Sequence, residues 1–175
     1  MISLGAAIIR TALRAYTYPY RKRFASLSRS VTLKNKAYEP PKGFTFTKEK
    51  YGGVQVEKLV PPEAKKGIIL QFHGGGHTAS MNDMYRKAAE QLAANCDRVV
   101  YSIDYRSGTD LVYPAVHDEC YLAYEALCKA VLSNGNFVVI GDSFGANLLL
   151  STCLRARDNH LPLPSAIVCI CSFID

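Results

Sequence analysis

The sequence predicts an α/β fold, a mostly parallel sheet with crossover helices. Short apolar runs alternate along the chain with longer segments whose apolar residues recur at helical spacing, as is typical of parallel strands joined by helices. Glycine-rich turns follow two of the apolar runs, at residues 74–76 and 141–145. Both turns stand at the carboxyl ends of strands, where open parallel sheets bind ligands. With 175 residues, the chain is long enough for one domain with a substantial core.

The N-terminus carries the positive charge of the chain. The net charge is +6, but residues 1–36 hold eight Lys and Arg and no Asp or Glu, so the remainder is at −2. The body therefore has no excess of basic residues with which to bind nucleic acid. The apolar run of residues 2–9 is too short to span a bilayer, and the charges follow it, unlike those of a secretory signal. We favour a helix lying across the domain over an anchor on a membrane surface.

The first half of the body predicts three strands and a helix. Residues 43–48 and 54–60 read as strands of a hairpin around Tyr51-Gly52-Gly53. Residues 68–72 form a continuous apolar run, as expected for a strand that is covered on both faces. A helix is predicted from about Asn82 to Asn95, because its alanine and leucine residues gather on one face.

The second half predicts three more strands and two helices. Residues 98–103 form the next strand, and Pro114 opens a helix to about Leu132. A buried strand over residues 136–140 leads into a helix from Gly145 to about Arg157. Residues 166–171 form the last predicted strand, and its apolar residues 167–170 would be an exposed sheet edge able to pair with another chain.

The cysteines predict neither a metal site nor a disulfide framework. They show no C-x-x-C pair and no metal-ligand spacing. In apolar segments cysteine behaves as a small hydrophobic residue, so we expect reduced, buried thiols in a cytoplasmic protein. The six residues are Cys96, Cys120, Cys128, Cys153, Cys169 and Cys171.

The turn at residues 141–145 has the pattern Gly-x-Ser-x-Gly directly after a strand. A sharp strand-to-helix turn exposes a serine hydroxyl, and side chains at Gly141 and Gly145 would clash in such a turn. The simpler interpretation of Ser143 is a helix N-cap. The second glycine cluster upstream favours a catalytic nucleophile instead.

Acyl transfer also needs hydrogen-bond donors where the carbonyl oxygen becomes negative. The backbone N–H of Phe144 lies at a predicted helix N-terminus, where the helix dipole adds to it. Gly75 and Gly76 would supply further N–H groups, because glycine lets a backbone approach a substrate closely. A flexible turn is the alternative interpretation, but three consecutive glycines after a strand favour an oxyanion hole.

Four motifs in one order carry a family resemblance. They are His73-Gly74-Gly75-Gly76, Asp104-Tyr105-Arg106, Tyr113-Pro114-Ala115 and the run Gly-Asp-Ser-Phe-Gly-Ala-Asn-Leu over residues 141–148. Over roughly residues 65–175 the chain resembles the hormone-sensitive-lipase-like esterases of the α/β-hydrolase fold. The resemblance implies an incomplete α/β-hydrolase core at residues 41–175, preceded by a basic helical arm at residues 1–40 that forms part of a cap.

The function implied by this resemblance is hydrolysis of a small carboxylic ester through an acyl-enzyme on Ser143, with no metal and no cofactor. His73 and Gly74 would support the oxyanion loop, and neither His73 nor His77 would be the catalytic base. Phe144 stands where the family usually has a small residue, and its ring would narrow the acyl pocket.

The resemblance also assigns structural roles to charged residues. Asp142 would be structural, and Asp104 and Arg106 would form an ion pair that steadies the loop after their strand. The segment from Ser107 to Leu111 departs from the run that is usual in the family, Leu-Ala-Pro-Glu.

The general base is the missing part. In this fold the acid and then the histidine of the triad follow the nucleophile. Beyond Ser143 the only candidates are Asp158, His160 and Asp175. A helix rises ~1.5 Å per residue, which puts Asp158 and His160 roughly 20 Å from Ser143. The family places a structural or cap-linked Asp at the position of Asp175.

We therefore expect a chain that is the N-terminal part of an esterase, cut after the sixth strand. A non-catalytic binder of small ligands with the same fold is the alternative.

Overall fold

The computed structural model describes residues 11–12, 37–64, 66–76, 78–108, 110–133 and 136–172. Contacts divide the chain into two units, Met1–Lys36 and Ala37–Asp175. Of the predicted basic arm at residues 1–40, only residues 11, 12 and 37–40 are described, and residues 37–40 form neither helix nor strand; His77 and Asp175 also lie outside the described residues. None of the described helices is both long and apolar enough to cross a membrane.

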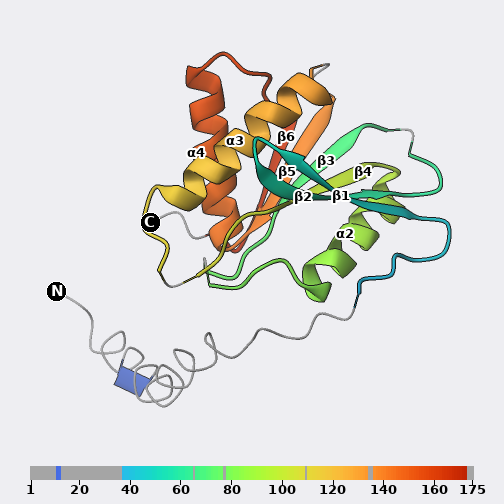
Figure 1. Cartoon of the computed structure of the whole chain (residues 1–175), viewed down its shortest axis with the longest axis horizontal. Coiled ribbons are helices and arrows are strands. Elements are labelled where there is room, and N and C mark those ends of the chain that lie inside the picture. Colours follow the sequence, from blue (N-terminus) through green and yellow to red (C-terminus); the bar gives the residue numbers. More distant parts are fainter. Residues whose placement is uncertain are drawn as a thin grey trace. The chain divides into compact units, whose positions relative to one another are not determined.

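The second unit contains a six-stranded sheet in the order β1-β2-β4-β3-β5-β6 (Figure 1). The β1–β2 and β2–β4 pairs are antiparallel, and β4, β3, β5 and β6 are parallel to one another. The mostly parallel sheet with crossover helices is therefore confirmed. The strands are β1 (Thr45–Tyr51), β2 (Val54–Val60), β3 (Ile68–Phe72), β4 (Val99–Asp104), β5 (Phe137–Asp142) and β6 (Ala166–Ile170).

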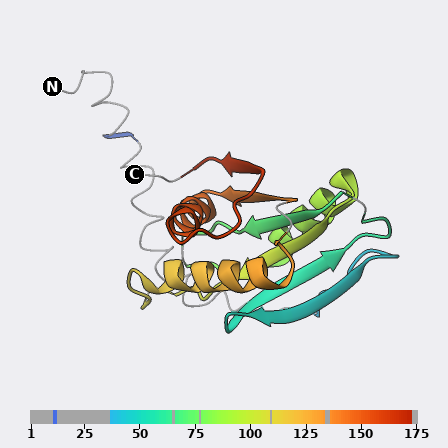
Figure 2. The ribbon, with the colours of Figure 1, turned by 90° about the horizontal axis from the view of Figure 1, so that it is seen from above.

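Three described helices cover the sheet. They are α2 (Asp83–Cys96), α3 (Ala115–Ala130) and α4 (Phe144–Asp158). Helices α3 and α4 lie side by side on one face, and α2 covers the opposite face (Figures 1 and 2). Asn82 caps α2 by accepting a hydrogen bond from the N–H of Met84 at 3.0 Å, which fixes the start of the helix close to its predicted position.

The strand predictions hold to within two residues at each end, except for the first strand, whose end is three residues later than predicted. The strand expected from Gly43 begins at Thr45 and continues to Tyr51. Gly43 has a φ of +86° and belongs to the preceding turn. A residue in that conformation cannot continue an extended strand.

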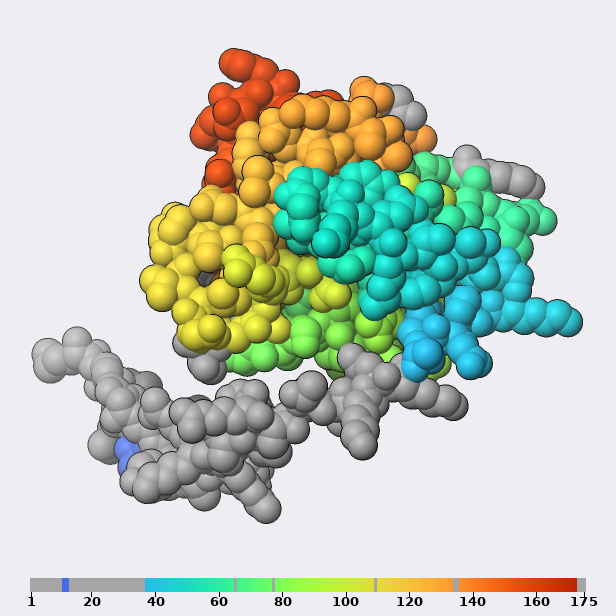
Figure 3. Space-filling view, viewed as in Figure 1, coloured from blue at the N-terminus to red at the C-terminus, as the bar shows by residue number. Residues whose placement is uncertain are grey.

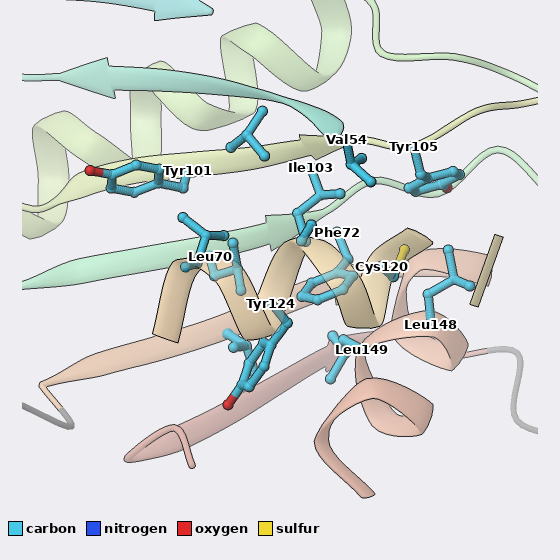
Figure 4. Close-up of a cluster of buried hydrophobic side chains, with 14 of the residues drawn as sticks. Val54, Leu70, Phe72, Tyr101, Ile103, Tyr105, Cys120, Tyr124, Leu148 and Leu149 are labelled. Atoms are coloured by element: carbon cyan, nitrogen blue, oxygen red, sulfur yellow. The ribbon is translucent and has the colours of Figure 1, made fainter. Parts of the chain in front are cut away.

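Two clusters of buried side chains hold the layers together. The larger cluster lies between the sheet and helices α3 and α4, where Leu70 and Phe72 face Tyr124 and Leu149 (Figure 4). The smaller cluster includes Ile69 of β3 and Ala89 and Ala93 of α2. Successive residues of β3 thus enter opposite clusters, as predicted for a strand covered on both faces.

One buried ion pair joins α2 to the antiparallel end of the sheet. Arg86 donates to both carboxylate oxygens of Glu57, from Nε at 2.8 Å and from Nη2 at 2.7 Å. Both side chains are buried. A pair with this two-bond geometry satisfies the charges that would otherwise be costly to remove from water.

The burial of the cysteines was predicted correctly for three of them and wrongly for two. Cys120, Cys128 and Cys153 are buried, and burial raises the pKa of the Cys153 thiol to about 11. Cys169 and Cys171 are exposed. The reason is that Cys169 lies on β6, the last strand of the described sheet, in which all five residues are exposed.

Candidate active site

Ser143 lies at the apex between β5 and α4. Its backbone has φ of +50° and ψ of −118°, and its side chain makes no capping hydrogen bond to the helix. Its N–H donates to the carbonyl of Ile170 at 2.9 Å, which holds the turn against β6. A positive φ in a serine costs about 1–3 kcal/mol and is typical of functional turns. The N-cap interpretation therefore fails, because the hydroxyl is not used as a cap.

The glycines of this turn are required by close contacts. A Cβ on Gly145 would lie 2.2 Å from the carbonyl oxygen of Phe72 and 2.5 Å from that of His73. A Cβ on Gly141 would lie 2.7 Å from the carbonyl oxygen of Gly145. The turn thus packs its backbone directly against the end of β3, from which the second glycine cluster begins.

The glycine loop uses two conformations that favour glycine. Gly75 has φ of +101° and Gly76 has φ of +58°. A Cβ on Gly75 would lie 2.6 Å from Cβ of Ala79, whereas a Cβ on Gly76 would meet no atom of the described residues within 4 Å, its chain neighbours aside. Glycine is therefore favoured at position 76 by the positive φ of the backbone. The open space beside it lets a ligand approach the backbone.

Asp142 ties the glycine loop to the serine turn. The N–H of Gly74 donates to Oδ1 of Asp142 at 3.0 Å, and the Tyr85 hydroxyl lies 3.5 Å from Oδ2. A Cβ on Gly74 would lie 2.3 Å from the latter oxygen. The residue before the candidate nucleophile thus fixes the position of the candidate oxyanion loop.

His73 is a structural residue of this loop. Its Nδ1 lies 2.9 Å from the carbonyl oxygen of Gly74, so Nδ1 carries the proton, and its ring stacks on Tyr105 at 4.1 Å. The Tyr105 hydroxyl in turn donates to the His73 carbonyl at 2.5 Å. Burial lowers the pKa of His73 to about 4, although the Gly74 carbonyl opposes this shift. An imidazole with so low a pKa is a poor general base, and among the described residues its Nε2 has no hydrogen-bond partner.

The expected ion pair between Asp104 and Arg106 is wrong. Arg106 pairs with Glu119 of α3, and its backbone N–H also donates to that carboxylate at 3.0 Å. Burial raises the pKa of Asp104, which lies at the end of β4. Successive side chains of an extended segment point to opposite sides, so residues 104 and 106 share a side only if the strand continues, and β4 ends at Asp104.

The other described histidines lie apart from His73. His117, in the first turn of α3, donates from Nε2 to Oδ1 of Asn147 at 3.0 Å, and its ring contacts Phe144 and Tyr113. His160 follows the far end of α4, as predicted. Among the described residues, no group of three or more His, Cys, Asp and Glu side chains could hold a metal ion.

Two cavities border the turn. One of about 400 Å³ lies between α2 and the ends of β5 and β6, and Tyr85 and Asp142 form part of its wall. The other, of about 180 Å³, lies beside the start of α3. Its lining residues are Leu111, Val112, Tyr113, Val116, His117 and Phe144.

Ser143 and the glycine loop lie at the same edge of the sheet, as predicted, whereas Tyr85, His117 and Glu119 were not predicted as supporting residues. Each of these acts across a long separation, for example 57 residues between Tyr85 and Asp142. Nothing in the local pattern of a helix marks such a side chain, because buried and ligand-facing residues share the same periodicity.

A protein family and several known proteins are similar to this chain. A family model described as the alpha/beta hydrolase fold matches residues 69–175. LipR of Mycobacterium tuberculosis, provisionally named an acetyl-hydrolase, is 29% identical over 178 residues, which are 99% of this chain and 58% of that protein. Human hormone-sensitive lipase is 29% identical over 107 residues, which are 59% of this chain and 10% of the lipase.

Solved structures agree with this result. The crystal structure of a hormone-sensitive lipase from a metagenome library superposes with a TM-score of 0.71 at 31% identity, and covers 79% of this chain and 47% of that one. An esterase of the bacterial hormone-sensitive lipase family gives a TM-score of 0.72 at 25% identity, with 79% and 47% covered. The chain therefore spans less than two thirds of the length of these relatives.

Proposed function

The chain belongs to the α/β-hydrolase fold family and is similar to its hormone-sensitive-lipase-like esterases, and on this premise we propose that it carries the nucleophile and oxyanion hole of a carboxylic-ester hydrolase. Ser143 is the nucleophile, and the N–H groups of Gly75, Gly76 and Phe144 are the oxyanion donors. The observation that carries the proposal is the conformation of Ser143: a strained apex residue whose side chain does not cap the helix that follows it.

The chemistry follows from this arrangement. Ser143 Oγ attacks the ester carbonyl carbon, its proton passes to a base, and the carbonyl oxygen becomes negative against the three N–H groups. The tetrahedral intermediate collapses as the base gives this proton to the leaving alcohol, and water then attacks the acyl group on Ser143. Water gives a proton to the base, and the second intermediate collapses as that proton returns to Ser143 Oγ and the acid is released. The substrate is a small ester, as the names of the esterase relatives suggest, and no step needs a metal or cofactor.

The base belongs to a part of the protein beyond these residues. Burial lowers the pKa of His73 to about 4 and makes it a weak base, the Nε2–H of His117 is donated to Asn147, and His160 is at the opposite end of α4 from Ser143. The fold places an acid and then a histidine in later strand-end loops. We accordingly propose that residues 41–175 are the N-terminal part of the catalytic domain, and that residues 1–40 contribute to the cap over it.

Reaction with a fluorophosphonate probe tests the proposal. In the chain expressed together with the sequence that continues it, the probe should label Ser143, because the phosphonyl oxygen occupies the oxyanion site. Ser143→Ala should abolish labelling and leave the unfolding midpoint unchanged. Ser151→Ala, a control inside α4, should label like the wild type. Labelling that survives Ser143→Ala, or maps to another serine, contradicts the assignment.

Turnover by the 175-residue chain alone tests the position of the base. Without a base, the oxyanion and binding contributions leave a rate about 10³-fold above that in water, far below ordinary enzyme rates. Rapid hydrolysis of p-nitrophenyl acetate through Ser143 would place the base inside the chain, with His117 as the first residue to change. An intact fold whose Ser143 never reacts with the phosphonate, even with the continuing sequence present, would favour a non-catalytic binder.

A further inference from the structure

The cavity of about 180 Å³ has a wall that begins at the residue next to the candidate nucleophile. Its three rings are Tyr113, His117 and Phe144, and its aliphatic side chains are Leu111, Val112 and Val116. We call these six residues the aromatic pocket. Ser143 is not itself one of the lining residues, but it is bonded to Phe144, and consecutive Cα atoms are about 3.8 Å apart, so a group on Ser143 starts one residue from the pocket wall.

The walls of the aromatic pocket are held in place from two elements. His117 on α3 is fixed by its hydrogen bond to Asn147 on α4, and its ring meets those of Phe144 and Tyr113 edge to face at 6.0 and 5.0 Å. The loop before α3 closes in a turn in which the N–H of Ala115 donates to the Val112 carbonyl at 3.0 Å. A pocket with such fixed walls discriminates between ligands by size.

The mouth of the aromatic pocket is at the surface. Val112 and Tyr113 are 76% and 78% exposed, which is unusual for large apolar side chains that stand next to each other. The segment that carries them belongs to the yellow region at the surface in Figure 3. A ligand can therefore enter without displacing core side chains.

Size and lining define what the aromatic pocket accepts. An apolar cavity of about 150 Å³ holds one benzene ring, so a pocket of this size accepts a short acyl chain or one ring but not two fused rings. Of the two substituents of an ester carbonyl, the acyl group is the one that stays bonded to the serine after the alcohol leaves. We propose that the aromatic pocket is the acyl subsite, and that Phe144 and His117 set its upper size limit at about one benzene ring; this inference rests on the proposed function.

Binding of amide analogues tests the inference without turnover. In Ser143→Ala protein, NMR titration with benzamide should shift the methyl signals of Val112 and Val116, and 2-naphthamide should bind about tenfold more weakly, an exclusion of about 1.4 kcal/mol. Phe144→Ala on this background should abolish the difference, because the second ring then has space. His117→Ala should also reduce the difference in affinity between benzamide and 2-naphthamide. Val112→Phe, at an exposed position that tolerates the change, should fill the pocket and prevent benzamide binding.

Controls separate the acyl side from the alcohol side. N-(2-naphthyl)acetamide carries the same rings on the leaving-group side, and Phe144→Ala should not improve its binding. His160→Ala removes an imidazole far from the pocket and should leave both affinities unchanged. The inference is wrong if Phe144→Ala improves binding of the N-aryl acetamide instead, or if 2-naphthamide already binds the unaltered pocket as well as benzamide does.

These outcomes are independent of the proposed nucleophile. Size-selective binding without fluorophosphonate labelling would support the aromatic pocket as a ligand site and overturn the proposed esterase function. Labelling without size-selective binding would retain the esterase and overturn the acyl subsite.

Discussion

Substitution of Gly145 by alanine should damage both the fold and the reactivity of Ser143. The new Cβ would lie 2.2 Å from the Phe72 carbonyl oxygen, and ordinary carbon–oxygen contacts are about 3.3 Å or longer, so the two backbones must separate by about 1 Å. Phe72 cannot move freely, because β3 is paired on both sides, with β4 and with β5. Overpacking of this kind costs about 1–3 kcal/mol, and we expect a loss near 3 kcal/mol because both clashing atoms are backbone carbonyls.

The rate at which Ser143 reacts should fall by more than the loss of stability alone would cause. The separation moves Ser143 away from the glycine loop, and a misplacement of about 1 Å can slow an active-site reaction about 100-fold. The assay is urea unfolding followed by circular dichroism, together with the rate of fluorophosphonate labelling under conditions in which the variant is folded. Gly53→Ala is the matched control.

The Gly53→Ala control separates the effect of backbone strain from the effect of an atomic clash. Gly53 has φ of +83° in the β1–β2 hairpin, and a Cβ there meets no atom within 4 Å. Its alanine variant should lose about 1–2 kcal/mol through backbone strain and label at the wild-type rate. If Gly145→Ala unfolds within 1 kcal/mol of the wild type and labels normally, the contact between the serine turn and β3 does not position Ser143, and the reasoning is refuted.

Two further predictions concern stability at low pH and the free edge of the sheet. The folded-state pKa of His73, about 4, is below the ordinary value of 6.5, so the unfolded chain binds more protons between these values and the free energy of unfolding falls as the pH drops from 6.5 to 4. The His73 contribution to this loss is at most about 3 kcal/mol, at 1.36 kcal/mol per pKa unit. His73→Gln should flatten the slope in urea unfolding series at successive pH values, and an unchanged slope would show that other groups cause it. On the edge strand β6, Val168 is 43% exposed, and the 175-residue chain should self-associate through this strand. Val168→Lys should shift the protein toward the monomer in size-exclusion chromatography, whereas a wild type that is already monomeric at all concentrations would contradict the prediction.

The sequence by itself determined the order of the elements and the position of the serine turn. Strand β3 and helix α2 were predictable because burial leaves periodic signals, such as the continuous apolar run at residues 68–72 and the alanine and leucine residues on one face of residues 82–95. The turn around Ser143 was predictable because its geometry excludes side chains at Gly141 and Gly145. The structure gives the same reason, with close backbone contacts at both glycines.

Only the tertiary structure decided which side chains support the site. Asp142 accepts a hydrogen bond from the N–H of Gly74, 68 residues earlier in the sequence. Arg106 forms its ion pair with Glu119 rather than with Asp104. His117 and Phe144 form one pocket only because α3 and α4 pack side by side, and Cys169 is exposed only because β6 is the last described strand of the sheet. Such contacts depend on how distant elements pack. That packing is determined by the fit of side chains throughout the core and not by any local sequence pattern.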